Sequence, residues 1–507
     1  MTMNKQTLSS ALEESFLRFK DQTAIRFDGN TFTYADLDKI TGKLAEELVS
    51  EGLKPGDRVA VRLPKGMAVV IVHLACLRSG IVTLPLNPLY SEEELKYFLS
   101  DSRARGIVAE VGEKSFIESL QHDLQELEFI HYVDHSGREW VEQDFKNDRS
   151  ISRHAVRPDD GAIMFYTSGT TGPPKGCIMT QKSCIVNLTA ISQAWGITDK
   201  DRLMHVLPLN HAHGLYVALF GSLLNGCFVF MKKSFDAEEV LQEIGHHKLS
   251  LFMGVPTHYN RFLTIKEANR FSLDSMRLFI SGSAPLSQET FTDFKETFGY
   301  EILERYGMTE IGIHISNPLN GARLPGKVGF PLPGAEARVV DIGTGDILGP
   351  GKTGELQVRG PNVFSGYWRK PEETEKCFSS DGWFKTGDLA ESNEDGYFSI
   401  VGRLKDLIIS GGLNISPLEV ESVINSHPAV SESAVIGVPD RDFGEKVVAY
   451  IVLNENCKAP SLEEIQALCK QHLSSFKKPK EIYFIEKLPR NAMGKILKQQ
   501  LRMGYSG

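Results

Sequence analysis

Short apolar runs alternate with amphipathic stretches through the first part of the chain. Arg58–Leu63, Ile81–Pro85 and Gly106–Glu110 are apolar segments of strand length, bounded by polar or turn-forming residues. Ala68–Gly80 and Glu92–Leu99 lie between them and have the length and pattern of helices. Strands that alternate with helices of this length usually form a parallel sheet with helices on both faces. The pattern therefore predicts an α/β fold.

The same alternation of predicted helices and strands continues from Gln181 onward. The predicted helices and strands are, in order, Gln181–Trp195, Leu203–Pro208, Cys227–Met231, Ala237–Gly245, Leu251–Gly254, Thr257–Phe262, Leu278–Ser281 and Gln288–Phe298. One long apolar stretch, Gly214–Met231, contains the turn-forming pair Asn225-Gly226. It is therefore predicted to be a buried helix followed by a strand, and no transmembrane segment is expected.

Near Gly326 the pattern changes, because strands become shorter and glycine and proline become more frequent. Four short strands are predicted here, at Ala337–Asp341, Gly354–Gly360, Trp383–Leu389 and Tyr397–Gly402. After these strands, from about Lys405, strands and helices mix, and about 100 residues suffice for a separate α+β domain. We therefore expect an N-terminal domain of residues 1–403, with a β-barrel at about 326–402, and a C-terminal domain of residues 404–507.

Composition and charge narrow the possible functions. The chain has 507 residues, of which 41% are hydrophobic and 24% charged, as in an ordinary soluble protein. Its formal net charge of −9 argues against a nucleic-acid-binding protein. The seven cysteines are scattered, which favours reduced thiols and a cytoplasmic location. The apolar residues of the first helix, Leu8, Leu12 and Phe16, alternate with charged ones, so we expect an amphipathic helix rather than a signal peptide.

The segment Thr167–Gly176 has the most distinctive composition in the chain. It follows the apolar run Ala162–Tyr166 and contains four hydroxyl side chains, three glycines and one lysine. Glycine lets backbone N–H groups approach phosphate oxygens, hydroxyls donate hydrogen bonds, and lysine adds positive charge. The order of residues differs from a Walker P-loop. The candidate polyphosphate ligands are Thr167, Ser168, Gly169, Thr170, Thr171, Gly172 and Lys175. The structural alternative is a polar surface turn.

Three further segments could bind the rest of a nucleotide. Tyr306–Glu310 combines an aromatic ring, a hydroxyl and a carboxylate that could hold Mg²⁺, although a Thr-Glu pair is often only a helix cap. Ser281–Pro285 follows a predicted strand, where ligands bind in open α/β sheets, but it could be a plain tight turn. Asp388 could accept hydrogen bonds from ribose hydroxyls or serve as a turn aspartate.

The C-terminal part and one histidine pair add weaker candidates. Lys495 lies behind a glycine in a loop-like stretch of a basic tail, where it could neutralise a phosphate. Gly411 and Gly412 follow a predicted strand and could allow close approach of a ligand. His211 and His213 could line a pocket or bind a metal, but no third ligand of recognisable spacing follows them.

Taken together and in this order, these segments resemble the adenylate-forming superfamily of acyl-CoA synthetases, luciferases and adenylation domains. The matching segments are Thr167–Gly176, Tyr306–Glu310, Tyr397–Pro417 and Pro489–Lys495. The resemblance implies a large N-terminal domain of two α/β subdomains plus a small β-barrel, followed by a mobile α+β lid. It also implies two half-reactions. A carboxylate attacks Mg·ATP to give acyl-AMP and pyrophosphate, and the thiol of coenzyme A then displaces AMP.

The resemblance assigns roles to individual residues. Glu310 would bind Mg²⁺, Thr309 would contact the α-phosphate, and Lys495 would bridge the carboxylate and the α-phosphate. Besides the loop, the implied ATP and AMP ligands are Gly282, Ser283, Ala284, Tyr306, Asp388 and Arg403. Rotation at a hinge, Lys405, would replace Lys495 by Gly411 and Gly412, which would form a channel for the pantetheine arm of coenzyme A.

Within the superfamily the greater likeness is to malonyl-CoA synthetases. The segments that carry it are Val255–Arg261, Arg277–Leu286, Leu303–Glu310 and Ser316–Pro318. It implies that Arg261 and Ser283 hold the far carboxylate of malonate or methylmalonate, and that His211 and Met308 line the same pocket. Asn210–His213 and Ile311–His314 depart from the usual sequences of that group. A different short, branched or aromatic acid is therefore an alternative, as is transfer to an acyl carrier protein or an amine. No oligomeric state is predicted.

Overall fold

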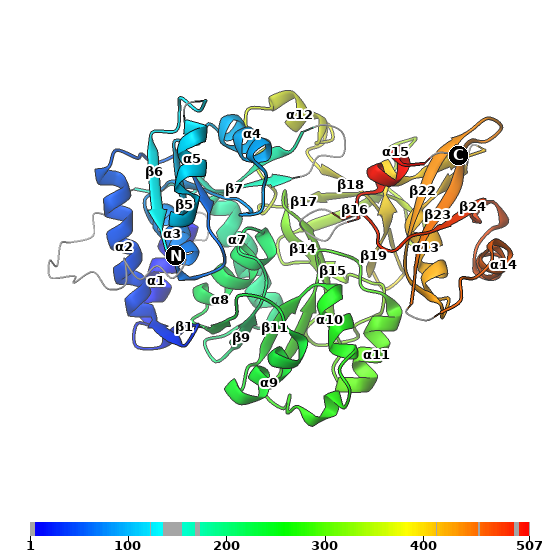
Figure 1. Ribbon diagram of the computed structural model, residues 1–507, viewed down its shortest axis with the longest axis horizontal. Helices are drawn as coiled ribbons and strands as arrows, with labels where there is room; N and C mark the ends of the chain where they lie inside the picture. The colour runs from blue at the N-terminus through cyan, green and yellow to red at the C-terminus, as the bar shows by residue number, and fades with distance from the viewer. Residues whose placement is uncertain are drawn as a thin grey trace. The chain divides into compact units, whose positions relative to one another are not determined.

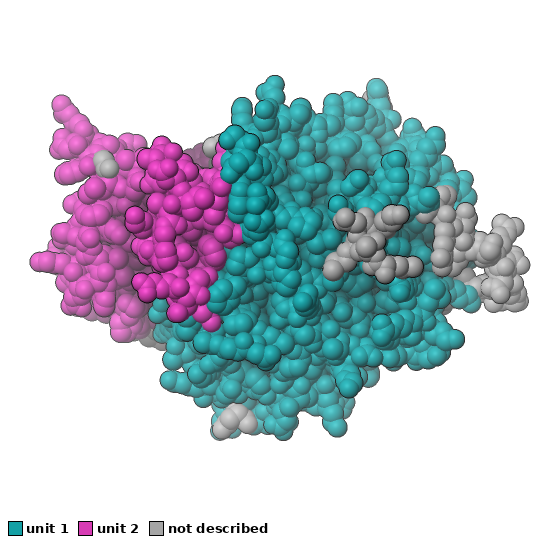
Figure 2. All heavy atoms as spheres, turned by 180° about the vertical axis from the view of Figure 1, so that it is seen from behind, with its two compact units in different colours: residues 1–336, 358–384 teal, residues 337–357, 385–507 magenta. Residues whose placement is uncertain are grey.

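The computed structural model describes residues 6–121, 123–134, 155–167, 173–411, 413–454, 457–490 and 496–505. The chain divides into two compact units, coloured separately in Figure 2. Unit 1 comprises residues 1–336 and 358–384, and unit 2 comprises residues 337–357 and 385–507. No helix among the described residues combines the length and the hydropathy needed to cross a membrane.

The first sheet of unit 1 has six strands in the order β6-β5-β3-β4-β7-β8. Its strands are β3 (Arg58–Arg62), β4 (Val82–Pro85), β5 (Gly106–Glu110), β6 (Phe129–Val133), β7 (Gly161–Thr167) and β8 (Lys175–Thr180). They are parallel except for β8, which pairs antiparallel with β7. The helices that alternate with them are α3 (Met67–Arg78), α4 (Glu92–Ser102) and α5 (Lys114–Gln121). The prediction of a parallel α/β sheet is confirmed.

The second sheet has nine strands in the order β15-β14-β13-β12-β11-β9-β10-β1-β2. Its strands are β1 (Thr23–Phe27), β2 (Asn30–Thr33), β9 (Arg202–His205), β10 (Phe228–Met231), β11 (Leu251–Gly254), β12 (Leu278–Ser281), β13 (Leu303–Met308), β14 (Gly312–Ser316) and β15 (Phe330–Pro331). Three helices pack on it, α9 (Ala237–His247), α10 (Pro256–Leu263) and α11 (Gln288–Phe298), visible in green in Figure 1. A cluster of phenylalanines, including Phe252, Phe262 and Phe294, fills the layer between them.

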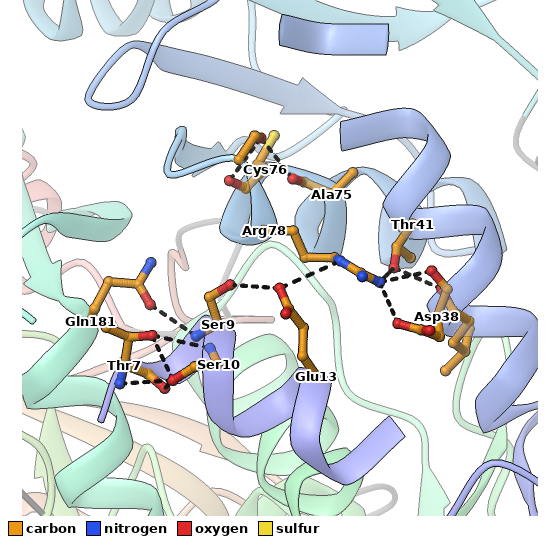
Figure 3. Close-up of polar contacts among 12 residues, drawn as sticks. Thr7, Ser9, Ser10, Glu13, Asp38, Thr41, Ala75, Cys76, Arg78 and Gln181 are labelled. Atoms are coloured by element: carbon orange, nitrogen blue, oxygen red, sulfur yellow. Dashed lines mark hydrogen bonds and ion pairs between the residues drawn. The ribbon is translucent and has the colours of Figure 1, made fainter. Parts of the chain in front are cut away.

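The N-terminal segment connects the two sheets of unit 1. Helix α1 (Leu8–Arg18) contacts α2 (Tyr34–Ser50), α3 and α7 (Gln181–Trp195). In Figure 3 the buried Arg78 of α3 donates from Nη1 to the Asp38 carboxylate at 2.8 Å and lies 3.7 Å from the Glu13 carboxylate. The backbone N–H of Ser9 donates to Gln181 at 3.0 Å. Sequence analysis predicted α1 but missed α2 and the β1–β2 pair. Polar residues in these elements interrupt the apolar pattern.

The predicted buried helix after Gly214 is present but has an unexpected geometry. Residues His213–Phe220 form a π-helix, η3, which continues into the short helix α8 (Gly221–Leu224). A Cβ atom at Gly214 would lie 2.0 Å from the carbonyl oxygen of Pro208, so only glycine fits at this approach. The wider turn was missed because apolar periodicity does not distinguish a π-helix from an α-helix.

Unit 2 contains most of a four-stranded sheet and all of a five-stranded one. The first has the order β16-β17-β18-β19, from Glu336–Val340, Gly354–Arg359, Phe384–Ser392 and Phe398–Arg403. The second consists of β20 (Ile408–Ser410), β21 (Leu413–Ile415), β22 (Val430–Asp440), β23 (Gly444–Leu453) and β24 (Glu481–Phe484). Its helices are α13 (Pro417–Asn425), α14 (Leu462–His472) and α15 (Lys498–Met503). The mixed α and β character predicted for the last hundred residues is confirmed.

Candidate functional site

The phosphate-binding loop predicted from the sequence connects β7 to β8. Thr167 and Lys175 are cross-strand partners at the ends of these strands, whereas Ser168, Gly169, Thr170, Thr171 and Gly172 lie outside the described residues. The Lys175 ammonium forms an ion pair with Glu373 of α12 (Pro371–Lys376) and lies 5.2 Å from the centre of the Tyr367 ring. The lysine of the loop is thus held by a carboxylate and an aromatic ring that sequence analysis did not single out.

Glu310 lies at the tight turn between β13 and β14. The Ile311 N–H donates to the Met308 carbonyl at 3.1 Å, which closes the turn. The Glu310 side chain is buried, and its Oε1 accepts a hydrogen bond of 2.9 Å from the Tyr367 hydroxyl. Burial, and then the Glu310 charge, raise the pKa of Tyr367, so the tyrosine stays a neutral donor. The carboxylate proposed for Mg²⁺ is therefore fixed in one orientation.

The same turn brings together the other residues predicted near the nucleotide. Tyr306 of β13 is buried, and its hydroxyl lies 3.9 Å from the Met308 sulfur. Thr309 follows in the turn and is half-buried. Strand β12 runs parallel to β13 with Ser281 opposite Glu304, so Gly282, Ser283 and Ala284 begin at the carboxyl end of this strand.

Ser283 has a backbone conformation that few non-glycine residues adopt. Its φ angle is +70°, in the left-handed region, which costs of order 1 kcal/mol or more for a residue with a Cβ. In this conformation its hydroxyl lies 3.2 Å from Nδ1 of His213 on η3. Strained residues of this kind are concentrated at functional sites.

Arg305 is a buried residue of β13 that sequence analysis quoted within a motif but did not single out. Its side chain is 5% exposed, and its Nε and Nη2 atoms have no hydrogen-bond partner among the residues that the structure describes. Burial lowers the pKa of Arg305 to about 10, so the guanidinium remains charged at neutral pH. The signal was available, because Glu304-Arg305 places two charges side by side in an otherwise buried strand.

Four histidines lie near the carboxyl ends of β9 and β11, namely His205, His211, His213 and His258. Burial lowers the pKa of His205 to about 3 and those of His211 and His258 to about 4, and it lowers that of His213 well below its usual value. All four imidazoles are therefore neutral at physiological pH, where they can donate or accept hydrogen bonds without adding charge.

A cavity of about 340 Å³ opens near these histidines. Apolar residues from both sheets of unit 1 line it together with Lys65, His73, Asn210, Lys233 and His258. Lys65 donates to the His205 carbonyl at 3.1 Å. The cavity lies beyond the carboxyl ends of β3, β4, β9 and β10, which is where small molecules bind in open α/β sheets.

Arg261 does not share the buried environment of Arg305. It lies on α10 with an exposed side chain, and its assignment to the acid pocket stays a prediction. Ser283 and Ala284 are also exposed on the face of their turn, whereas Met308 is half-buried.

Unit 2 carries the remaining predicted residues. Asp388 of β18 is buried and forms an ion pair with the neighbouring Arg403 of β19, with Oδ1 and Nε 2.9 Å apart. Lys405 follows in a 3-10 turn, and burial lowers its pKa. The Gly411 N–H donates to the Phe443 carbonyl at 2.8 Å. Gly412 and Lys495 lie outside the described residues.

Comparison with known proteins decides the family. Residues 12–368 match the AMP-binding enzyme family model, and residues 419–495 match the model of the AMP-binding enzyme C-terminal domain. This chain belongs to the AMP-binding enzyme family. A long-chain-fatty-acid–CoA ligase of Bacillus subtilis is 35% identical, with 99% of this chain and 95% of that protein covered. A mitochondrial malonate–CoA ligase of Mus musculus is 35% identical, with 96% and 89% covered.

Solved structures agree with this family assignment. The ATP-bound crystal structure of MatB from Rhodopseudomonas palustris superposes with a TM-score of 0.91 at 38% identity, covering 98% of this chain and 99% of that one. The architecture implied by the resemblance, a large N-terminal α/β domain and a smaller C-terminal domain, is thereby confirmed.

Proposed function

We propose that this member of the AMP-binding enzyme family is an ATP-dependent carboxylate–CoA ligase that acts on malonate or methylmalonate. In the first half-reaction a carboxylate oxygen of the acid attacks the α-phosphorus of ATP, and the bond to pyrophosphate breaks. In the second, the thiol sulfur of coenzyme A attacks the acyl carbon, and AMP leaves. The observation that carries the ligase proposal is the buried Glu310 carboxylate, fixed by Tyr367 in a chain of this family.

The residues around Glu310 fit a magnesium ion. A carboxylate oxygen is the ligand type that Mg²⁺ prefers, and the Tyr367 hydrogen bond occupies Oε1 while orienting the group. Mg²⁺ would screen the charge of the triphosphate during attack. Thr309 would then position the α-phosphate, and Tyr306 would position the adenine. The loop from Thr167 to Lys175 would hold the terminal phosphates.

In the same proposal the chain consists of an N-terminal domain, residues 1–403, and a C-terminal lid domain, residues 404–507. The N-terminal domain includes a β-barrel at about 326–402. Asp388 binds the ribose, Arg403 assists it, and Lys495 bridges the two anions that must meet in the first half-reaction. Rotation at Lys405 exchanges Lys495 for Gly411 and Gly412 between the half-reactions. We place the enzyme in the cytoplasm and take coenzyme A as the acceptor in preference to a carrier protein or an amine.

Malonate is favoured by the similarity to the malonate–CoA ligase of Mus musculus. The comparably similar long-chain-fatty-acid–CoA ligase of Bacillus subtilis makes a long monocarboxylic acid the second candidate. The test is pyrophosphate release with malonate, methylmalonate, short and long monocarboxylic acids and benzoates, with and without coenzyme A. Malonate should be turned over at least tenfold more efficiently than propionate. A higher kcat/KM for a long-chain acid would refute the proposed substrate.

A second experiment tests the lid. Lys495→Ala should abolish pyrophosphate release yet preserve thioester formation from synthetic malonyl-AMP and coenzyme A, because the lysine is needed only while charge develops at phosphorus. Equal loss in both half-reactions would contradict the role of Lys495. Lys487→Ala, which removes a lysine from the same tail, is the matched control and should leave both half-reactions intact.

A further inference from the structure

Lys65 lines the cavity described above, and its amine has no acidic partner among the residues that the structure describes. The residue lies in the loop between β3 and α3 and is half-buried. Its Nζ atom donates a hydrogen bond to the His205 carbonyl at 3.1 Å. An ammonium group that is enclosed without an anion is unfavourable, and a lysine in such a place is a candidate for a chemical role.

The surroundings of Lys65 favour the neutral amine over the ammonium. Burial lowers the pKa of Lys65 well below its usual value. Lys65 also directly precedes Gly66, the N-cap of α3, and the partial positive charge of a helix N-terminus opposes a second positive charge. No aspartate or glutamate is found among the described residues that line the cavity. A neutral amine has a free lone pair and can act as a nucleophile.

The titratable groups that line the cavity or contact Lys65 add no negative charge. They are His73 of α3, His205 of β9, His258 of α10 and Lys233, which follows β10. Burial lowers the pKa values of His73 and His205 to about 3 and that of His258 to about 4, so these rings are neutral near pH 7. None of these neighbours can stabilise an ammonium by ion pairing.

A continuous series of contacts leads from Lys65 to the predicted acid site. His205 accepts the Lys65 hydrogen bond with its carbonyl, and its ring Nε2 lies 2.9 Å from the Gly214 carbonyl oxygen of η3. His213, the preceding residue of η3, contacts the Ser283 hydroxyl with Nδ1 at 3.2 Å. The cavity therefore adjoins the segment that lies behind Ser283, and we expect the acyl group of a bound acyl-AMP to be accessible from it.

We propose that Lys65 is an acyl acceptor, so that the enzyme acylates its own side chain when coenzyme A is absent. This inference rests on the proposed ligase function, which supplies the acyl-AMP. The Nζ lone pair attacks the acyl carbon, a C–N bond forms, and the bond between that carbon and the phosphate oxygen breaks. AMP leaves with the electron pair of this bond, and the nitrogen releases one proton to water. The products are an amide on Lys65 and free AMP.

Lys233 provides a comparison within the same cavity. Its side chain is 54% exposed, and its Nζ lies 3.5 Å from the Asp28 carboxylate. A nearby carboxylate stabilises the ammonium form, and an ammonium has no lone pair with which to attack. The two lysines should therefore differ in reactivity, although Lys233 is the more accessible of the two to solvent.

The decisive experiment supplies synthetic malonyl-AMP or propionyl-AMP to the protein without coenzyme A and maps acylated lysines by peptide mass spectrometry. Lys65 should carry about tenfold more adduct than Lys233, because only a neutral amine reacts. Lys65→Arg should remove the main adduct, whereas Lys233→Arg, the matched change in the same cavity, should leave it within about twofold. No adduct at Lys65 in the wild type with either compound, or adducts that follow solvent exposure, would overturn the inference.

The pH dependence of the adducts separates a neutral lysine from one that is merely accessible. Between pH 7 and 9 the neutral fraction of an ordinary exposed lysine rises about tenfold per pH unit, because its pKa is about 10.4. The lowered pKa of Lys65 makes its amine neutral over more of this range. The ratio of adduct at Lys65 to adduct at the exposed Lys54 should therefore fall as the pH rises. A constant ratio would contradict the proposal.

The proposed function and this inference fail in different measurements. Synthetic acyl-AMP bypasses the first half-reaction, so the adduct at Lys65 is measured whether or not the enzyme releases pyrophosphate with malonate. Absence of pyrophosphate release with every acid would refute the ligase proposal, and an adduct at Lys65 would still support the acceptor role. Normal pyrophosphate release with an unmodified Lys65 would overturn the inference alone.

Discussion

The two groups of residues in unit 1 that are proposed to bind anions differ in whether they already have partners within the protein. On the phosphate side, Lys175 is paired with Glu373, and the Glu310 carboxylate accepts a hydrogen bond from Tyr367. On the acid side, Arg305 and His213 have buried nitrogen atoms without hydrogen-bond partners in the described part of the chain. The residues of the first group therefore have protein partners before any ligand binds, whereas the donors of the second group would gain partners only from a ligand.

This difference suggests that one group binds the nucleotide and the other selects the acid. Every substrate brings the same triphosphate, so paired residues on that side need only exchange partners when it binds. The acid varies between enzymes of the family, and a pocket with unsatisfied donors penalises any acid that lacks the matching group. Changes on the phosphate side should therefore affect all acids alike, and changes on the acid side should affect only dicarboxylates.

The largest effect is expected on the phosphate side. Glu310→Gln should lower kcat for pyrophosphate release about 100-fold or more with every acid, because a neutral amide is a poor ligand for Mg²⁺ and several kcal/mol of stabilisation are lost. Tyr367→Phe, which removes only the hydrogen bond to Glu310, should cost about fivefold. Steady-state rates with malonate and propionate measure both variants. A loss confined to one acid would break the proposed division.

A smaller and selective effect is expected at Gly282. Gly282→Ala would bring a Cβ within 2.3 Å of the Arg305 guanidinium and push it from its position. The kcat/KM for malonate should fall roughly 30-fold, with a smaller loss for propionate, since a displaced charged hydrogen bond costs about 2 kcal/mol. Gly112→Ala, where an added Cβ would meet no other atom within 4 Å, is the control. Equal losses for the two acids would indicate a nucleotide effect instead.

The pH dependence should show the same division. The ratio of kcat/KM for malonate to that for propionate should be constant between about pH 7 and 9, because Arg305 stays protonated and His213 stays neutral there. It should fall as the pH passes about 10, the pKa of Arg305, since deprotonation removes the cation. In Arg305→Lys the fall should occur at lower pH, because an ammonium loses its proton more readily than a guanidinium. A ratio that falls near pH 7 would point instead to ionisation of Glu304, whose pKa is raised by burial to about 7.

The smallest effect is expected at the exposed ion pair of Lys175. Glu373→Gln should change the free energy of unfolding by about 0.5 kcal/mol or less, because both side chains are partly exposed. Lys175 lowers the pKa of Glu373, so the stabilisation is present above the usual glutamate pKa and is lost as the pH falls through the lowered one. Denaturant unfolding at pH 7 and at pH 3 measures both. A loss above about 2 kcal/mol would show that the pair is structural.

Sequence reasoning was most successful where one pattern decides the local structure. Strand and helix boundaries such as Gly106–Glu110, Gln181–Trp195 and Gln288–Phe298 were predicted as they occur. It missed the β1–β2 pair, whose stability comes from a distant strand rather than from its own apolar content. Tyr367 and Glu373 were missed for the same reason. They contact Glu310 and Lys175 from a later segment of the chain, and nothing in their local sequence indicates a role.

Arg305 illustrates a different limit. Its position in a buried strand was visible in the sequence, but whether a buried charge has a partner depends on which side chains fold around it. Arg261 was chosen because of the family resemblance, and only its position on an exposed helix face distinguishes it from Arg305.

The pairing of β1 with β10 has a consequence for how the chain is made. Ile25 lies beside Val229, so the N-terminal strand has no partner on that side until the second half of unit 1 is being synthesised. At about 5–20 residues per second, a ribosome needs about 10 to 40 s to cover this interval. During that time the apolar strand β1 is an open sheet edge, the kind of surface that chaperones cover. Production of the enzyme in a cell should therefore depend on translation speed and chaperone supply more than its final stability would suggest.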